Sequence, residues 1–287
     1  MRSKKSNKIL LYFTSLLLIV FIFLPFALII FSSFQNESML LRPVFSTSKE
    51  SFTLENYKYI LFKTPIISST GELRSRVTAS AQEIPITLKN SIFVASITAL
   101  INLIICTIAA FVFAYYKFRG SLITYFFVLL SRIIPPIAVT VPFFTIIKNA
   151  GLLDTRISLI FVYCAMTLPI TLYFYRVHFE KIPVEIKEAA MLEGCSDMMI
   201  LTKIILPITR PGLLAGALFA FFLSYGEFLF ALSLTQTNKA RTLPVLLSGI
   251  ISNPDLSYAL LCSAVVIAII PSIVIGFIVR KHLTKLY

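Results

Sequence analysis

The sequence has few charged residues, two histidines and four cysteines. Charged side chains make up 14% of its 287 residues and hydrophobic ones 57%, which leaves a soluble domain too little polar surface to cover its exterior. The cysteines are scattered without a CxxC spacing, so we expect neither a disulfide nor a metal site. Lipid is therefore expected to be the main solvent of this chain.

Acidic residues are also scarce, since 26 Lys and Arg face 13 Asp and Glu. A net charge of +13 could suggest a nucleic-acid partner, but the basic residues are not interleaved with aromatics in a patch. They cluster beside the hydrophobic runs, where they are typical of topology signals. We expect no nucleic-acid binding.

The amino terminus lacks the features of a cleaved secretory signal. Its apolar run from Ile9 to about Phe34 is longer than the core of a signal peptide, and no Ala-x-Ala exit follows it. We interpret the run as a retained first membrane span, in which Pro25 kinks the helix without ending it.

Long apolar runs dominate the rest of the chain. A helix rises about 1.5 Å per residue and the hydrocarbon core is about 30 Å thick, so about 20 apolar residues are needed per crossing. The sequence predicts an all-α membrane protein with about six transmembrane helices. The predicted spans are Ile9–Phe34, Ile86–Tyr116, Leu122–Ile147, Ile157–Val177, Leu213–Thr235 and Tyr258–Val279.

The basic residues orient these spans. With the amino terminus inside, the inner segments hold 14 Lys and Arg and the short outer segments hold four. Both termini are therefore predicted to be cytoplasmic. In the long outer stretch, the aromatic part Phe52–Phe62 is expected to pack on the membrane surface or on a partner, and the polar part Thr64–Ser80 to form an exposed loop.

Between the fourth and fifth spans, residues 178–213 contain a predicted short helix from Pro183 to Glu193. Pro183 suits a first helical turn, Glu185 complements the positive helix end, and Gly194 can adopt the left-handed conformation that closes a helix.

This predicted helix has one small, mostly apolar face that could lie in a groove on another protein. Its residues are Ile182, Ile186, Ala189, Ala190 and Glu193. A second helix is predicted from Ser196 to about Ile205, because Pro207 and Pro211 should break it.

The same segment resembles the inner-membrane subunits of binding-protein-dependent ABC importers. Their hallmark is Glu-Ala-Ala, three further residues, Gly, and later Ile-x-Leu-Pro. It stands here as Glu188, Ala189, Ala190, Gly194, Ile204, Leu206 and Pro207. The resemblance implies that these residues, with Glu185, dock into a cleft of a cytoplasmic ATPase and transmit its closure to the membrane. The alternative is an amphipathic interfacial hairpin without a partner.

The resemblance extends over most of the chain after Thr87, and it is strongest to the sugar-importer branch that includes the second maltose permease subunit. Matching pieces are Lys117-Phe118-Arg119-Gly120, Arg132 with Pro135-Pro136, Gly151-Leu152-Leu153-Asp154-Thr155, Leu168-Pro169, Glu227-Phe228-Leu229 and Thr242-Leu243-Pro244. The branch's usual Trp-Asn before the glutamate is Tyr225-Gly226 here.

This resemblance implies a permease subunit in a bacterial cytoplasmic (inner) membrane. Its implied partners are a sister permease in a heterodimer, a cytoplasmic ABC ATPase dimer that binds ATP and Mg, an extracytoplasmic solute-binding protein, and membrane lipid. The implied cargo is a mono- or oligosaccharide, with a polyol or a glycerol phosphate as alternatives.

The sequence has no GxxxxGK[ST] phosphate loop, so the chain is expected to hold no cofactor and no ATPase site of its own. A secondary transporter would need intramembrane carboxylates, and Glu227 is the clear candidate. An intramembrane enzyme would need a Ser-His, paired-Asp or metal-ligand pattern, which the spans lack. His178 and His282 are interpreted as surface residues.

Two ionisable residues are predicted near mid-membrane, Arg132 in the third span and Glu227 in the fifth. An unpaired charge there costs at least about 2.5–3.5 kcal/mol on insertion scales, so each should face the bundle interior and find a partner. One hypothesis places both at the translocation cavity, pairing in one state, with Tyr225 as a stacking face. The other makes them static struts bonded to backbone.

Gly212 and Gly216 form a GxxxG that permits close helix approach, within this chain or to a sister permease. The domain prediction has three parts: residues 1–85 with the first span and the outer loop, 86–280 with five helices and a coupling segment at about 183–206, and 281–287 as a short cytoplasmic tail.

Overall fold

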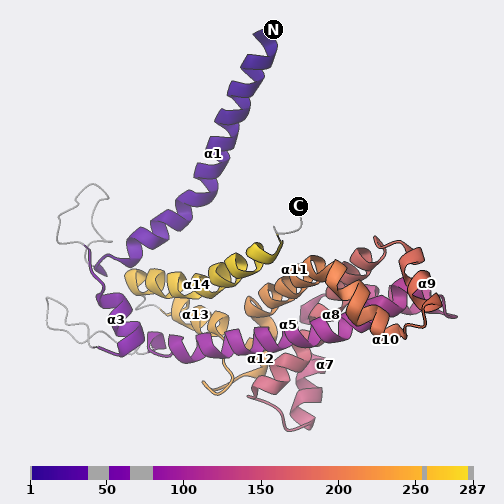
Figure 1. Ribbon diagram of the computed structural model, residues 1–287. Helices are drawn as coiled ribbons and strands as arrows, with labels where there is room; N and C mark the ends of the chain where they lie inside the picture. The colour runs from indigo at the N-terminus through magenta and orange to yellow at the C-terminus, as the bar shows by residue number, and fades with distance from the viewer. Residues whose placement is uncertain (1, 38–51, 65–79, 254–256, 284–287) are drawn as a thin grey trace. The chain divides into compact units, whose positions relative to one another are not determined.

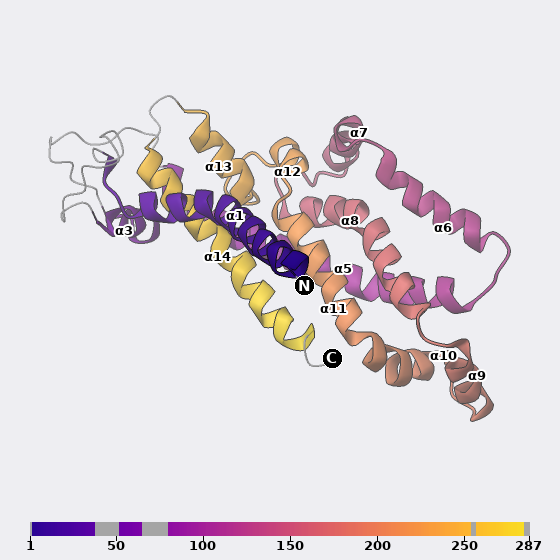
Figure 2. The same ribbon diagram turned by 90° about the horizontal axis from the view of Figure 1, so that it is seen from above.

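The computed structural model describes residues 2–37, 52–64, 80–253 and 257–283. Most of the predicted polar loop Thr64–Ser80, and the end of the predicted tail 281–287, lie outside these ranges. The helices, labelled in Figure 1 apart from α6, which Figure 2 labels, are α1 (Arg2–Ser33), α3 (Glu55–Phe62), α5 (Ile84–Tyr115), α6 (Ser121–Leu130), α7 (Pro136–Asn149), α8 (Arg156–Phe179), α9 (Val184–Leu192), α10 (Asp197–Met199), α11 (Leu206–Tyr225), α12 (Leu229–Leu234), α13 (Leu243–Ile251) and α14 (Tyr258–Leu283).

Five of the described helical stretches are long and apolar enough to cross a membrane, and six if the bent pair α6–α7 counts as one span. This confirms the predicted all-α class with about six spans. The five are Leu11–Ser33, Ile84–Tyr115, Arg156–Phe179, Asp197–Tyr225 and Tyr258–Arg280. Prolines such as Pro25 and Pro169 lie inside these helices without ending them, as is common in membrane spans.

The predicted third span, Leu122–Ile147, is not one helix. Helix α6 and a short 3-10 turn end at Ile133, and α7 leaves at an angle of 100° (Figure 2). Pro135 and Pro136 explain the break, because a proline disfavours the helical conformation of the residue before it. Ile134 and Pro135 accordingly have extended ψ angles of 122° and 131°.

The predicted fifth span, Leu213–Thr235, is wrong at both ends. The helical stretch begins at Asp197 and runs to Tyr225, and α12 is a separate short helix. Pro207 and Pro211 do not break it. A π-helical turn, Ile200–Ile205, lies directly before Pro207, and such a turn accommodates a residue that cannot donate the regular hydrogen bond.

The chain divides into two compact units, and the first comprises residues 1–85 and 247–270. In it, the predicted aromatic segment Phe52–Phe62 packs on the end of α1. The side-chain amide of Asn56 donates to the carbonyl oxygens of Ser33 and Gln35, at 3.2 and 2.9 Å. Tyr59 and Ile60 are buried, whereas Phe52, Leu54, Leu61 and Phe62 are exposed, so one side of this segment packs on its own chain and the other side is open.

The second unit comprises residues 86–246 and 271–287, and α5, α8 and α11 form its centre. Buried polar side chains join these helices: Asn102 donates to Thr167 at 2.5 Å, and the Tyr175 hydroxyl donates to the Leu213 carbonyl at 2.9 Å. Gly212 and Gly216 lie against α8, where an added methyl group would clash with His178 and Tyr175. The GxxxG therefore serves packing within this chain, as the first interpretation predicted.

Candidate functional site

Helix α9 begins and ends where the sequence predicts. Pro183 has φ −55° and ψ 136° at its start, Glu185 lies in its first turn, and Leu192 is its last residue. Gly194 follows with φ 82°, and its N–H donates to the Met191 carbonyl at 3.0 Å. No heavy atom lies within 4 Å of a methyl group placed there, so the backbone angle alone requires glycine.

The exposed face of α9 differs in part from the predicted docking face. Lys187 and Ala190 are buried, as is Ile182 just before the helix, so Ile182 and Ala190 contact this chain and do not form an open face. The exposed residues of the segment include Glu185, Ile186, Glu188, Ala189, Leu192 and Glu193. Leu192 is 90% exposed. An acidic and apolar surface is therefore available to a partner, and it keeps Ile186, Ala189 and Glu193 of the predicted face.

Of the other three residues of the sequence motif, Ile204 lies in the π-helical turn, and Leu206 and Pro207 lie beyond it. Leu206 is half-buried and Pro207 is exposed, both in the first turn of α11. Figures 1 and 2 show α9 and α10 at one end of this unit, with α7 and α12 away from them. The predicted coupling segment 183–206 thus contains α9, α10 and the π-helical turn.

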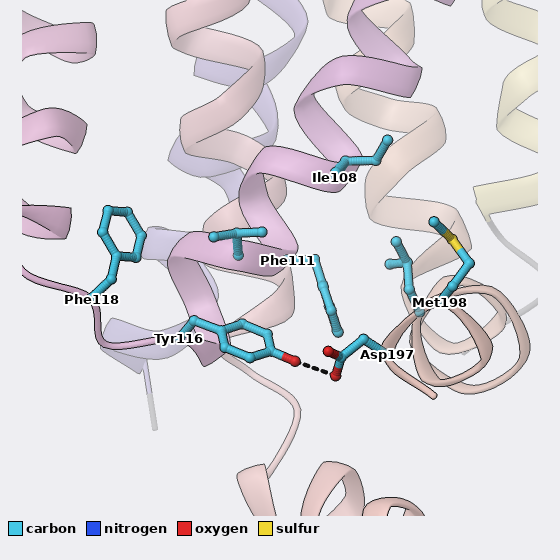
Figure 3. Close-up of a pocket in the computed structure, with 8 residues that line it drawn as sticks. Ile108, Phe111, Tyr116, Phe118, Asp197 and Met198 are labelled. Atoms are coloured by element: carbon cyan, nitrogen blue, oxygen red, sulfur yellow. Dashed lines mark hydrogen bonds between the residues drawn. The ribbon is translucent and has the colours of Figure 1, made fainter. Parts of the chain in front are cut away.

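Lys187 makes cation–π contacts with two tyrosines at the end of α5. Its Nζ lies 3.7 Å from the ring centre of Tyr116 and 5.9 Å from that of Tyr115. The Tyr115 hydroxyl donates to the Phe179 carbonyl at the end of α8, at 3.0 Å. The Tyr116 hydroxyl donates to the Asp197 carboxylate at the start of α10 (Figure 3). Through one pair of tyrosines, these contacts join the ends of α5 and α8, the start of α10 and an interior residue of α9.

Tyr116 remains a hydrogen-bond donor at physiological pH. Burial, together with the hydrogen bond to Asp197 and its negative charge, raises the pKa of Tyr116 to about 12. The side chain lies at the edge of an apolar cavity of about 460 Å³, shown in Figure 3. The cavity is lined by Ile108, Phe111, Val112, Tyr116, Phe118, Asp197, Met198 and Leu201.

Arg132 lies in the short turn at the break between α6 and α7. Its side chain is exposed, and Nη1 donates to the Met166 carbonyl of α8 at 3.2 Å. The break borders a cavity of about 250 Å³ lined by Ser131, Arg132, Ile134, Pro136, Val139, Phe143, Ala165, Met166 and Pro169. The Arg132 guanidinium therefore borders a cavity between helices.

Glu227 lies between α11 and α12, and its carboxylate caps α12. One oxygen accepts from the Phe230 N–H at 2.9 Å, and the other from the Ala231 N–H at 3.1 Å. Tyr225 stacks on Phe221, with ring centres 5.6 Å apart and planes at 14°. Within the described ranges no ion pair joins Arg132 to Glu227, and each is held on backbone groups. The strut hypothesis placed these partners at backbone freed by Pro135 and Pro136, whereas they are Met166, Phe230 and Ala231.

Sequence reasoning missed Asp154 as a positioning residue. Its Oδ1 accepts from the N–H groups of Gln236 and Thr237, at 2.9 and 3.0 Å, and its Oδ2 from the Thr237 hydroxyl at 2.5 Å. Burial raises the pKa of Asp154, but the hydrogen bonds from Thr237 and Gln236 lower it more, so the net shift is downward. The Gly151–Thr155 motif, which contains Asp154, was the sequence signal that could have identified this residue.

Apolar spans, a charged residue at a broken span and a short exposed helix define a multi-pass membrane transport protein. Residues 103–286 match the family described as the binding-protein-dependent transport system inner membrane component. The chain belongs to this family, the permease components of ABC transporters in the inner membrane.

Known proteins resemble the chain over much or all of its length. The trehalose/maltose transport system permease protein MalG of Thermococcus litoralis is 31% identical over 288 residues, 99% of this chain and 96% of that protein. The trehalose transport system permease protein SugB of Mycobacterium tuberculosis is 31% identical over 207 residues, 72% of this chain and 73% of that protein.

A solved structure shares the fold. It is a crystal structure of a bacterial ABC transporter involved in the import of the acidic polysaccharide alginate, and one of its chains superposes with a TM-score of 0.78 at 18% identity. The match covers 99% of both chains. The overall fold is therefore that of an ABC importer permease.

Proposed function

We propose that this chain is the permease subunit of a sugar importer and that the exposed face of α9 receives the movement of a separate ATPase. The observation that carries the proposal is the division of α9 into a buried side with Lys187 and Ala190 and an exposed side with Glu185, Glu188 and Leu192. A helix held on one side and open on the other can be displaced as a rigid piece by a partner.

The proposed transport cycle is one of alternating access. Closure of an ATPase dimer around ATP and Mg would push α9, and α9 would tilt the helices joined to it. The spans would then open a central cavity outward, where a solute-binding protein delivers its cargo. A sister permease, in a heterodimer, would complete that cavity. Both termini of this chain would lie in the cytoplasm, as the basic residues predict.

A sugar is favoured as cargo because the relatives named for trehalose and maltose match this chain at 31% identity, one of them over 99% of its length. Arg132 and Tyr225 offer a guanidinium and an aromatic ring, both of which suit a hydroxyl-rich ring. Glu227 already accepts two backbone N–H groups, an arrangement suited to holding α12 in place.

The test begins with the tagged chain purified from its own host in mild detergent. We expect a second permease, an ABC ATPase and a solute-binding protein to copurify. The reconstituted complex, supplied with ATP, should accumulate labelled trehalose or maltose. Accumulation of sorbitol or glycerol 3-phosphate in place of either sugar would replace the sugar assignment by its alternative. A purified chain without an ATPase would contradict the whole proposal.

A further inference from the structure

Lys187 is the most deeply buried charged side chain of α9, with 6% of its surface exposed, although its neighbours Ile186 and Glu188 are open. Lysine is almost never buried to this extent without a partner, because removing its ammonium from water is costly. The partners here are aromatic faces. The ring of Tyr116 is close enough for a strong cation–π contact, and that of Tyr115 is at the outer limit of one.

The tyrosine pair is itself rigidly placed. Both rings contact Phe111 one turn earlier in α5, with ring centres 5.4 and 6.0 Å apart. The Tyr115 hydroxyl is bonded to α8 and the Tyr116 hydroxyl to α10. A side chain that pushes on Tyr116 therefore pushes on the end of α5, since the ring has little freedom to move alone.

We propose that Lys187 and Tyr116 are positioning residues that connect α9 directly to α5, so that displacement of the exposed α9 face reaches this central helix without passing through the chain to α11. This inference rests on the proposed function, because it presumes that an ATPase moves α9. Neither residue belongs to the exposed face of α9. Their role is to make α9 and α5 move as one body.

The covalent connections of α9 lead to α8 and α10, and the one to α10 passes through Gly194 in a left-handed turn. Neither of them leads directly to α5. The cation–π contact joins α9 to the end of α5, beside the packing of Ile182 and Ala190 in the same buried cluster.

The decisive experiment uses the whole complex with Lys187→Met, which keeps the apolar stem and removes the ammonium, and Lys187→Arg, which keeps a cation over the ring. Glu188→Lys, on the exposed face, is the comparator. Four quantities are measured: the copurifying ATPase, the basal ATP hydrolysis, the hydrolysis stimulated by the binding protein, and the uptake of cargo.

For Lys187→Met we expect normal copurification, basal hydrolysis within about twofold of wild type, and stimulated hydrolysis and uptake reduced about tenfold, the equivalent of one contact of about 1.4 kcal/mol. Lys187→Arg should retain more than half of the wild-type stimulated hydrolysis and of the wild-type uptake. The proposal would be overturned if Lys187→Met and Lys187→Arg had equal stimulated hydrolysis and uptake, or if Lys187→Met kept wild-type stimulation. If Glu188→Lys also kept wild-type stimulated hydrolysis and uptake, the proposed function itself would be overturned.

A second measurement covers the case in which Lys187→Met fails to assemble. Lys187→Cys and Tyr116→Cys are combined in a background with the four native cysteines replaced, and a short bis-methanethiosulfonate reagent crosslinks them. Before crosslinking, stimulated hydrolysis should be low, because both members of the contact are gone. Because the two sites are proposed to move as one body, the crosslink should restore it, and a reductant should reverse the gain. Stimulated hydrolysis that the crosslink leaves unchanged or lowers further would overturn the proposal.

Discussion

The imidazole of His178 occupies the space beside Gly212, and a methyl group at position 212 would lie 2.1 Å from His178 Cδ2. The ring is held by a 2.7 Å contact between its Nδ1 and the Phe174 carbonyl. We predict that Gly212→Ala destabilises the complex by about 1–3 kcal/mol, because overpacking forces α8 and α11 apart. The measurement is the melting temperature of the detergent-solubilised complex.

Gly276→Ala is the matched control for this prediction. Gly276 also lies inside an apolar helix, α14, but nothing stands within 4 Å of a methyl group placed there. Alanine favours helix over glycine by about 0.8–1.0 kcal/mol, so this variant should be neutral or slightly more stable. Equal melting temperatures for Gly212→Ala and wild type would show that α8 and α11 repack without cost.

The closing turn of α9 gives the second prediction. Gly194→Val forces a β-branched residue to φ 82°, which costs roughly 1–2 kcal/mol or more locally, and so changes the orientation of α9. We expect uptake to be lost while membrane insertion and chain abundance stay normal. Gly194→Asn should retain most uptake, because asparagine tolerates the left-handed region. Full uptake with valine would contradict the assignment of α9 as the coupling helix.

Arg132 and Glu227 give the third prediction. Because each is held on its own backbone partners, the effects of Arg132→Met and Glu227→Gln on the melting temperature should add in the double variant. If both border the translocation path, each single variant should also lower uptake by about fivefold or more, with basal ATP hydrolysis retained. Lys148→Met, an exposed cation at the end of α7, is the control. Unchanged uptake in both variants would remove these residues from the path.

The lowered pKa of Asp154 gives a pH prediction. Its folded value lies below its ordinary value of 3.8, so its hydrogen bonds add stability above about pH 3.8, and that stability is lost as pH falls through the folded pKa. Asp154→Asn should therefore lower the melting temperature at pH 7, and the difference from wild type should shrink toward pH 3. Glu193→Gln serves as the exposed control. If the difference in melting temperature between Asp154→Asn and wild type did not change with pH, the effect would come from the shape of the side chain and not from its charge.

Reporter fusions test the topology and the broken span together. Fusions after Arg119 and near Glu193 should report the cytoplasm, and fusions near Gly151 and Lys239 the outside. If α6 and α7 together cross once, Arg119 and Gly151 lie on opposite sides. If the pair is re-entrant, both lie on the same side. A reversed pattern at any two sites would falsify the six-span topology.

The sequence carried enough information for the number of spans and for α9, because both rest on local signals. Apolar length predicts a span, and Pro183 and Gly194 predict the two ends of α9 from their own backbone preferences. The break at Pro135 escaped the span prediction since the hydropathy of Leu122–Ile147 is continuous across it. The proline pair was the available signal, and its effect on the preceding residue would have placed the bend.

Other features depend on residues distant in sequence. Nothing near Lys187 indicates that it is buried, because its aromatic partners lie about seventy residues earlier, and helical periodicity assigns charged residues to the surface. The continuation of the helix through Pro207 depends on a π-helical turn that local propensity does not favour. Tertiary packing therefore decides both, and with them the identity of the docking face.

The helical stretch from Asp197 to Tyr225 is longer than one membrane crossing requires. Its 29 residues would extend about 43 Å, roughly 13 Å more than the hydrocarbon thickness. The widened turn Ile200–Ile205 lies near its Asp197 end. In the proposed function, the extra length would place this end of the helix outside the lipid, where movement of α9 can reach it.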